Sequence, residues 1–322
     1  MSLLPLGPTQ QFGPTPPFSP TQQLGPAQPS SPAQPALADE SGCEFAPRAF
    51  TMAYSPAAGW HKPQLLPPEQ FALHPGSAGL HNGQIAGEGL RAYRRADGTI
   101  AAFRPWEHAR RFGKSARRLT MPALPDDLFV SAVEELVEAE DGSFDETPGS
   151  SLYLRSLMFA ADLSLGLFPA QHFGFVLMAR NDHPGTRAHA GQQASVDQLD
   201  GVNLFVVRPT QPRAEVTLLE QADEALRGVT TESVLTLASR LGYIVRQQRV
   251  TPDQWRAAHA HGDRSGITET FTCSTIEGVV PLGEGEIGPV TEVIRQALRD
   301  IHCGREPGPR GWMYQIPSPE PS

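Results

Sequence analysis

Apolar and polar residues alternate along the first part of the chain in a pattern that predicts both strands and helices. Two apolar segments flank an Asp-Gly turn at residues 96–98, which is typical of a β-hairpin. Two longer segments carry apolar residues at helical spacing, and the second follows a Pro-Asp-Asp sequence that suits a helix start. The predicted strands are residues 90–94, 100–104, 151–159 and 173–179, and the predicted helices are residues 104–119 and 126–138.

The second part repeats this mixture after a segment without any apolar period. Residues 180–201 are polar and begin with turn residues, so they predict a long loop that is either functional or left by the loss of a segment. Thr230 or Thr231 is expected to cap the helix that comes next. The predicted strands are residues 202–207, 242–249, 268–273 and 278–282, and the predicted helices are residues 231–241, 251–261 and 288–303.

Alternating strands and helices predict an α/β or α+β protein of two lobes. The tail before them holds ten of the 32 prolines and no charged residue before Asp39, so it cannot bury enough surface to fold alone. It repeats PTQQFGPT as PTQQLGPA, which indicates a spacer or a docking segment for a protein partner. The expected parts are a Pro/Gln-rich disordered tail (1–44), an N-terminal lobe (45–178), a shortened connection (179–201), a C-terminal lobe (202–316) and a short tail (317–322).

Composition and charge exclude several classes of protein. A net charge of −9 opposes sequence-independent binding of nucleic acid. No apolar run is long enough to span a bilayer, and no basic region precedes an apolar segment at the N-terminus, as a secretory signal requires. Three cysteines without a C-x-x-C pair indicate neither a disulfide framework nor a zinc site. We therefore expect a reduced, cytoplasmic protein that does not bind the membrane.

Several motifs together resemble those of one enzyme family. LHNGQIAGEGLRAYRRADG opens residues 80–119, and SLYLRSLMFAADLSLGLFPA (151–170) contains a Tyr-x-Arg pair. VNLFVV, LRGVTTESVLTLASRLGY, FTCSTIEGVVPLG and a Gly-Trp pair follow in order. The chain thus resembles a branched-chain aminotransferase over nearly all of residues 45–316. The resemblance implies the class IV fold of enzymes that use pyridoxal phosphate (PLP): two α/β lobes with the cofactor between them, usually as a homodimer.

The departures from this family concern its chemistry. Family enzymes carry the Schiff-base lysine between the strands that match residues 173–179 and 202–207. Here that interval is several tens of residues too short and holds no lysine, which implies a shortened second lobe. Only Lys62 and Lys114 occur in the chain, at positions where the family has non-catalytic residues. Because this lysine holds PLP as an imine and moves the α-proton, we expect no PLP and no ordinary transamination.

A second departure concerns the pyridinium nitrogen of PLP. The family glutamate that pairs with this nitrogen aligns best with Gln198, a neutral amide that cannot keep it protonated. The resemblance also suggests that the substrate cleft is wider here. Asn82 replaces a tyrosine, and Gly87 stands where the family has an aromatic residue. Both changes leave room for a bulkier ligand, although Gly87 could equally relieve packing after the deletion.

Residues that match the family's phosphate site remain. Arg94 and Thr275 match its phosphate-binding arginine and threonine, and Val229 and Thr230 match the helix start whose N–H groups receive the phosphate. An arginine, a hydroxyl and a helix N-terminus would form an anion-binding cup. The alternative is that Arg94 caps a strand end and Thr275 lies in a sheet.

Tyr153 and Arg155 match the pair that the family places near the substrate carboxylate, and we take them as catalytic candidates. Side chains two apart on a strand share one face, and arginine suits bidentate contact with a carboxylate. The alternative is a structural ion pair between Arg155 and a nearby acid. Cys273, in an apolar strand, is expected to be a core residue and not a nucleophile.

No metal site is predicted. Histidines occur in two groups, but their spacing matches no closed site, and we expect them to be solvated. The residues concerned are His183 and His189, and His259 and His261 with Asp263.

Three functions stay open. The first is PLP-independent cyclisation, isomerisation or elimination of a bulky carboxylate- or phosphate-bearing metabolite of specialised metabolism. The second is a non-catalytic binding or regulatory partner of a true aminotransferase. The third is a residual branched-chain amino acid aminotransferase, which requires a lysine that reaches the cleft. We adopt the first as the working hypothesis because the residues that would bind an anionic ligand are retained.

Overall fold

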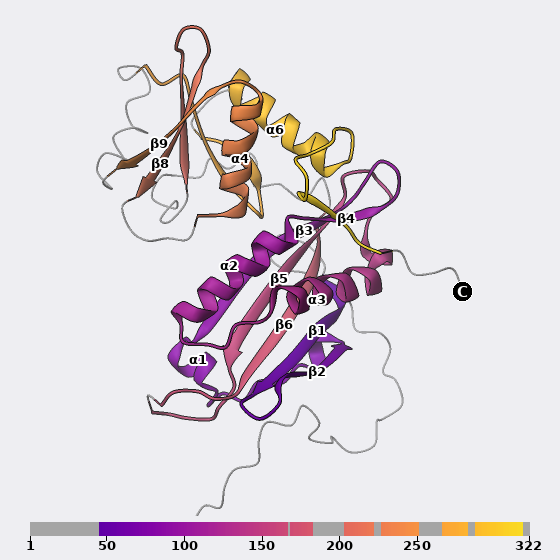
Figure 1. Ribbon diagram of the computed structural model, residues 1–322. Helices are drawn as coiled ribbons and strands as arrows, with labels where there is room; N and C mark the ends of the chain where they lie inside the picture. Colours follow the sequence, from indigo (N-terminus) through magenta and orange to yellow (C-terminus); the bar gives the residue numbers. More distant parts are fainter. Residues whose placement is uncertain are drawn as a thin grey trace, which may run out of the picture.

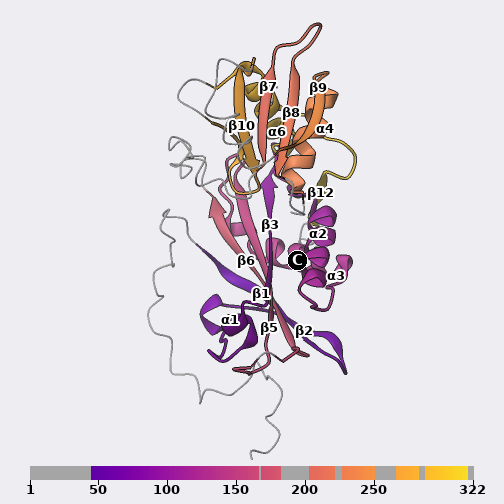
Figure 2. The same cartoon turned by 90° about the vertical axis from the view of Figure 1, so that its left-hand side faces the viewer.

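The structure is a computed structural model of the 322-residue chain, and it describes residues 45–166, 168–182, 203–221, 227–250, 266–282 and 287–317. Two lobes, each built on its own sheet, lie end to end (Figures 1 and 2). Among these residues, no helix is both long and apolar enough to cross a membrane.

The N-terminal lobe contains a seven-stranded sheet in the order β12-β4-β3-β5-β6-β1-β2. Every neighbouring pair is antiparallel, and short turns join β1 to β2 and β3 to β4. The strands are β1 (Phe45–Ser55), β2 (Gly59–Leu66), β3 (Ile85–Arg94), β4 (Ile100–Phe103), β5 (Ser151–Ala160), β6 (Phe173–Asp182) and β12 (Met313–Gln315).

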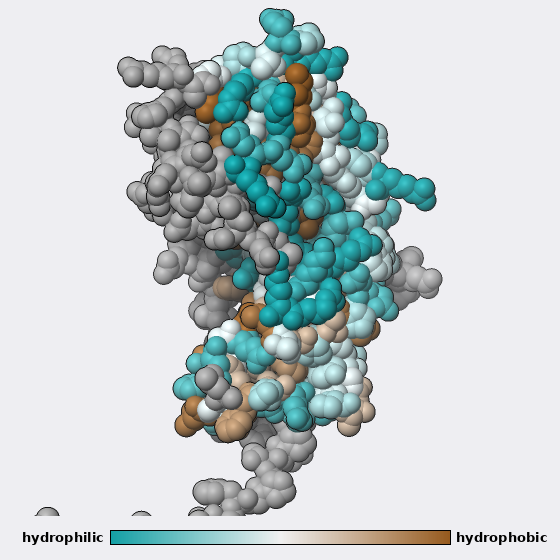
Figure 3. Space-filling model, turned by 60° about the vertical axis from the view of Figure 1, so that its left-hand side comes forward, coloured by the Kyte–Doolittle hydropathy of each residue, from teal (hydrophilic) through white to brown (hydrophobic). Residues whose placement is uncertain are grey.

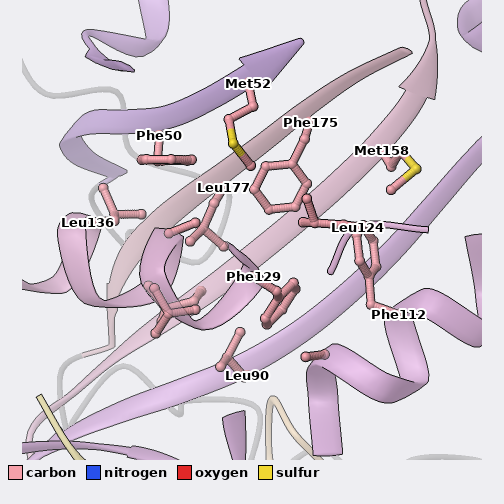
Figure 4. Packing of buried hydrophobic residues seen from close by; sticks show 14 of the residues in the cluster. Phe50, Met52, Leu90, Phe112, Leu124, Phe129, Leu136, Met158, Phe175 and Leu177 are labelled. Carbon is pink, nitrogen blue, oxygen red and sulfur yellow. The ribbon is translucent and has the colours of Figure 1, made fainter. Parts of the chain in front are cut away.

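Two helices cover one face of this sheet, α2 (Pro105–Arg118) and α3 (Asp126–Ala139) (Figure 1). The main core lies between them and the strands, and it includes a triangle of the rings of Phe112, Phe129 and Phe175, with centroids 5.5–6.2 Å apart (Figure 4). Short helices flank the strands: η1 (Pro68–Gln70), α1 (Ala78–Asn82) and η2 (Asp141–Ser143).

The C-terminal lobe contains a five-stranded sheet in the order β11-β10-β7-β8-β9. Helix α4 (Val229–Arg240) connects β8 to β9, which run parallel because the chain crosses over between them. With α6 (Pro289–His302), it packs on this sheet over a core that includes Phe205 stacked on Phe271. The strands are β7 (Leu204–Arg208), β8 (Glu215–Gln221), β9 (Ile244–Val250), β10 (Glu269–Ser274) and β11 (Gly278–Pro281).

Apolar residues also join the lobes. Tyr93 and Phe103, at the end of the β3–β4 hairpin, belong to the core of the C-terminal lobe, together with Trp312. Directly after Trp312 the chain returns to the first sheet, where β12 pairs with β4. The lobe boundaries therefore differ from those expected: residue 178 lies inside β6, and the last strand belongs to the N-terminal sheet.

Most predicted elements occur where the residue pattern placed them. The hairpin of β3 and β4, both helices of the N-terminal lobe and β5 agree with expectation within a few residues. The expected cap of α4 is wrong: Gly228 is its N-cap, and Thr230 and Thr231 lie in its first turn. The pattern did not identify β1, β2, β8 and β12. The predicted helix 251–261 and most of the predicted loop 180–201 lie outside the described residues.

Leu177→Ala is expected to lower the free energy of unfolding by about 2–5 kcal/mol, because the side chain is completely buried in the core beneath α2 and α3. The matched control is Leu241→Ala, just after α4, where the leucine is 42% exposed and the expected loss is within about 0.5 kcal/mol. Urea unfolding followed by circular dichroism measures both. Equal losses in the two variants would contradict this description of the core.

Candidate functional site

Tyr153 and Arg155 lie on the face of the N-terminal sheet that α2 and α3 leave uncovered. Leu152 and Leu154 belong to the core beneath the helices, so the alternate residues of β5 point to the opposite face. Tyr153 is buried and Arg155 is exposed. No acidic residue of the described part forms an ion pair with Arg155, so the alternative of a structural ion pair finds no support there.

Two arginines from the neighbouring strands flank Tyr153. The strand register places Arg91 of β3 and Arg180 of β6 directly opposite Tyr153. Each guanidinium carbon lies 5.6 Å from the centroid of the tyrosine ring, within the range of cation–π attraction. The sequence did not identify either arginine, because only the pairing of the strands brings them to Tyr153.

Glycines of β3 let these side chains lie flat on the sheet. A Cβ atom at Gly89 would stand 2.4 Å from the hydroxyl of Tyr153, so a larger residue there would displace the ring. At Gly87 it would stand 3.0 Å from the guanidinium of Arg155. Arg155 thus occupies the room that Gly87 leaves, and the expectation that Gly87 widens the cleft for a ligand needs correction.

Arg91 connects this face to the C-terminal lobe. Its Nε donates a hydrogen bond of 2.7 Å to the carbonyl of Thr275, and Nη2 donates to the carbonyl of Ile276. Nη1 donates to the hydroxyl of Ser151 at 2.9 Å, and the residue is only 3% exposed. The turn after β10 is thereby fixed against the open face of the N-terminal sheet.

The predicted Thr275, Thr230 and Val229 meet at this turn. The hydroxyls of Thr275 and Thr230 are 3.4 Å apart, and Val229 is the first residue of α4. The first N–H that bonds back into the helix is that of Glu232, so those of Val229, Thr230 and Thr231 have no acceptor within it. Hydroxyls and N–H groups at the positive end of a helix dipole can bind an anion.

Arg94 does not belong to this group, which corrects the expectation that it contributes to the anion cup. Its guanidinium bonds to the Asp141 carboxylate at 2.8 Å and to the Gly98 carbonyl at 3.3 Å. It also lines a hollow of about 80 Å³ beside Val137. The reason is strand alternation: Arg94 shares the helix-covered face with Ala92, whereas Arg91 points the other way.

Asn82, which was also expected to line the pocket, lies away from Tyr153 and Thr275. Asn82 ends α1, is exposed, and donates a hydrogen bond of 3.4 Å to the Gly166 carbonyl in the connection between β5 and β6. Gln198 lies outside the described residues, so its alignment with the family glutamate stays a prediction.

Both lysines of the chain are exposed, and neither belongs to the group formed by Arg91, Tyr153, Thr230 and Thr275. Lys62 lies in β2, at the edge of the N-terminal sheet and three strands away from β5. Lys114 lies in α2, the helix that covers the opposite face from Tyr153.

No metal centre is apparent in the described ranges, where no group of three or more His, Cys, Asp or Glu side chains could hold an ion. The histidines and Asp263 considered from the sequence lie outside these ranges. Cys273 is buried in the sheet of the C-terminal lobe, and burial raises its thiol pKa to about 12, although Thr231 lies within weak hydrogen-bonding distance at 3.6 Å. Such a thiol is protonated at neutral pH and is not a nucleophile.

We expect Cys273 to resist alkylation by iodoacetamide at pH 8 in the native protein, because that pH lies far below its raised pKa. The same cysteine should react in full once urea unfolds the chain and the pKa returns to its ordinary range. Peptide mass spectrometry measures both states. Rapid native alkylation of Cys273 would show that the thiol is accessible and ionised, contrary to its burial.

Comparison with known proteins identifies the family. No family model matches the chain. The probable branched-chain-amino-acid aminotransferase of Streptomyces coelicolor is 32% identical, and the match covers 85% of this chain and 92% of that protein. It runs over 340 residues, more than the 322 of the whole chain, so part of the relative stands opposite gaps.

Solved structures agree in fold. Branched-chain aminotransferase from Escherichia coli matches with a TM-score of 0.64 at 20% identity, over 84% of this chain and 100% of that one. The enzyme from Thermobaculum terrenum, solved in its PLP form, matches with a TM-score of 0.61 at 17% identity, over 84% and 99%. The resemblance seen in the motifs is therefore confirmed, and the chain belongs to the branched-chain aminotransferase family and has its class IV fold.

Proposed function

We propose that this protein is an aminotransferase-fold enzyme that works without PLP, on a bulky metabolite that carries a carboxylate or a phosphate. The reaction class is cyclisation, isomerisation or elimination, as in specialised metabolism. One observation carries the proposal: the anion-binding groups meet where the lobes join, and both lysines lie away from them.

The fit of PLP to these residues is partial. Thr230, Thr275 and the start of α4 offer donors for a phosphate group. A Schiff base needs a lysine, and neither Lys62 nor Lys114 fits that role. The gaps opposite the Streptomyces coelicolor protein also support the loss of a segment. No step of the proposed chemistry therefore uses PLP.

The residues on the open face suggest how the site would work. Arg155 is exposed and can bind a carboxylate through two parallel hydrogen bonds. The start of α4 can bind a second acidic group of the same ligand. Tyr153 has a hydroxyl that can give or accept a proton, and the nearby guanidinium groups would stabilise negative charge that develops on the ligand. General acid–base help of this kind contributes about 10²–10⁴ in rate.

An interaction role is the second candidate, because one surface of the N-terminal lobe exposes large apolar side chains. Leu163, Leu165 and Phe168, in the connection between β5 and β6, are 53%, 79% and 73% exposed. Apolar side chains are visible at this end of the molecule in Figure 3. Such a surface favours contact with another protein. A second copy of the chain or a true aminotransferase would suit it, and the homodimer stays a prediction.

Arg155→Ala is expected to weaken binding of 4-methylvalerate, a branched monocarboxylate, at least ten-fold, since a bidentate charge-assisted contact is lost. Binding of inorganic phosphate, which we assign to the start of α4, should stay within two-fold. The control Arg110→Ala removes an equal charge from the exposed side of α2 and should change neither affinity. Isothermal titration calorimetry measures these affinities, and urea unfolding checks the fold.

Unchanged 4-methylvalerate affinity in Arg155→Ala would exclude this residue from the carboxylate site. Conversion of branched-chain amino acids and 2-oxoglutarate by the wild-type protein with added PLP would contradict the proposed function itself. Such turnover would support the residual aminotransferase that the sequence left open.

A further inference from the structure

Arg104 has a backbone conformation that is unfavourable for an arginine followed by a proline. It directly precedes α2 and has a φ of 48° and a ψ of 46°, in the left-handed region. A Cβ atom disfavours this region, and the following Pro105 further favours an extended backbone at residue 104. Strain of this kind persists only where contacts with the surrounding structure hold the residue in place.

The side chain of Arg104 crosses from the N-terminal lobe to the first turn of α4. Its Nη1 donates to the hydroxyl of Ser233 at 2.8 Å and to the carbonyl of Val229 at 3.4 Å. Its Nη2 lies 3.4 Å from the carboxylate of Glu232. The guanidinium also packs 5.3 Å from the ring of Trp312, and the residue is only 9% exposed.

Arg104 makes none of these contacts with the groups of the first turn of α4 that are proposed to bind an anion. Arg104 bonds to a carbonyl and to side chains of α4, whereas the anion subsite proposed above consists of the N–H groups of Val229 and Thr230 and the hydroxyls of Thr230 and Thr275. Glu232 is the acidic residue of this turn, and its charge would repel a bound anion. Pairing with Arg104 offsets that charge.

Arg91 holds the segment that carries the other hydroxyl of the subsite, because it bonds to the carbonyls of Thr275 and Ile276. Two arginines of the N-terminal lobe thus hold the two segments of the C-terminal lobe that meet at the hydroxyls of Thr230 and Thr275.

We infer that Arg104 is a positioning residue for the anion subsite: it holds the first turn of α4 so that Thr230 and Thr275 act on one ligand. This inference rests on the proposed function, which supplies the anion. Arg104 does not touch the ligand and acts through α4.

Glycine adopts the backbone conformation of residue 104 without strain, so Arg104→Gly removes the guanidinium while it suits the local fold. We expect phosphate to bind at least ten-fold more weakly to this variant of the full chain, as measured by isothermal titration calorimetry. Thr120→Gly is the matched control. Thr120 follows the other end of α2, has a φ of 56° and is exposed, so its replacement should leave phosphate affinity within two-fold.

A double-mutant cycle separates positioning from general support of the fold. Arg104→Gly and Thr230→Ala should be non-additive for phosphate binding, because Arg104 is inferred to act by positioning the Thr230 hydroxyl, which Thr230→Ala removes. Their effects on the urea midpoint should add, since Arg104 stabilises the lobe junction by separate contacts. Arg104→Lys keeps the charge but not the planar fork, and it should recover only part of the affinity.

The outcomes distinguish this inference from the function on which it rests. Phosphate binding by the wild type that Arg104→Gly leaves within two-fold overturns only the role of Arg104. Equal weakening in Arg104→Gly and Thr120→Gly, or additive effects with Thr230→Ala, overturns it too. No phosphate binding by the wild type, or binding that Thr230→Ala does not affect, overturns the anion subsite and this inference together.

Discussion

The hydrogen bonds of Arg91 are the interaction on which the candidate site depends. A buried guanidinium is costly unless its donors are satisfied, and Arg91 satisfies them with two carbonyls of the C-terminal lobe and one hydroxyl of the N-terminal lobe. The same side chain packs on Tyr153. Arg91 therefore links the tyrosine on the sheet to the turn that carries Thr275. Loss of Arg91 would leave both sides of the junction with unpaired polar groups.

Period-two and period-3.6 patterns were enough to predict most of the fold and part of the site. The hairpin of β3 and β4 follows from its Asp-Gly turn, and the common face of Tyr153 and Arg155 follows from their spacing. The same parity argument separates Arg94 from Arg91, because Leu90 and Ala92 show which positions of β3 are buried under helices. The motif match alone assigned Arg94 to the anion-binding cup, whereas its side chain bonds to Asp141 and Gly98.

Other features depend on contacts that no local pattern contains. Arg180 reaches Tyr153 only through the register of β5 and β6, and Arg104 reaches Ser233 only through the packing of the lobes. Strand β8 did offer a signal, since Val216 and Leu218 alternate with polar residues. The cap of α4 was misassigned because threonine is a common N-cap, whereas here the hydroxyl of Thr230 meets that of Thr275.

A scaffold can keep its fold while its chemistry changes, because cores and sites depend on different residues. In this chain the overall fold agrees with that of the family, while the only lysines lie on an edge strand and on the exposed side of a helix. The central claim is that no lysine serves this site.

The most direct measurement is to incubate the full-length protein with PLP, reduce with borohydride, digest it and search by mass spectrometry for pyridoxyl-lysine. The account predicts no stoichiometric adduct, and a stoichiometric adduct on Lys62 or Lys114 would contradict it.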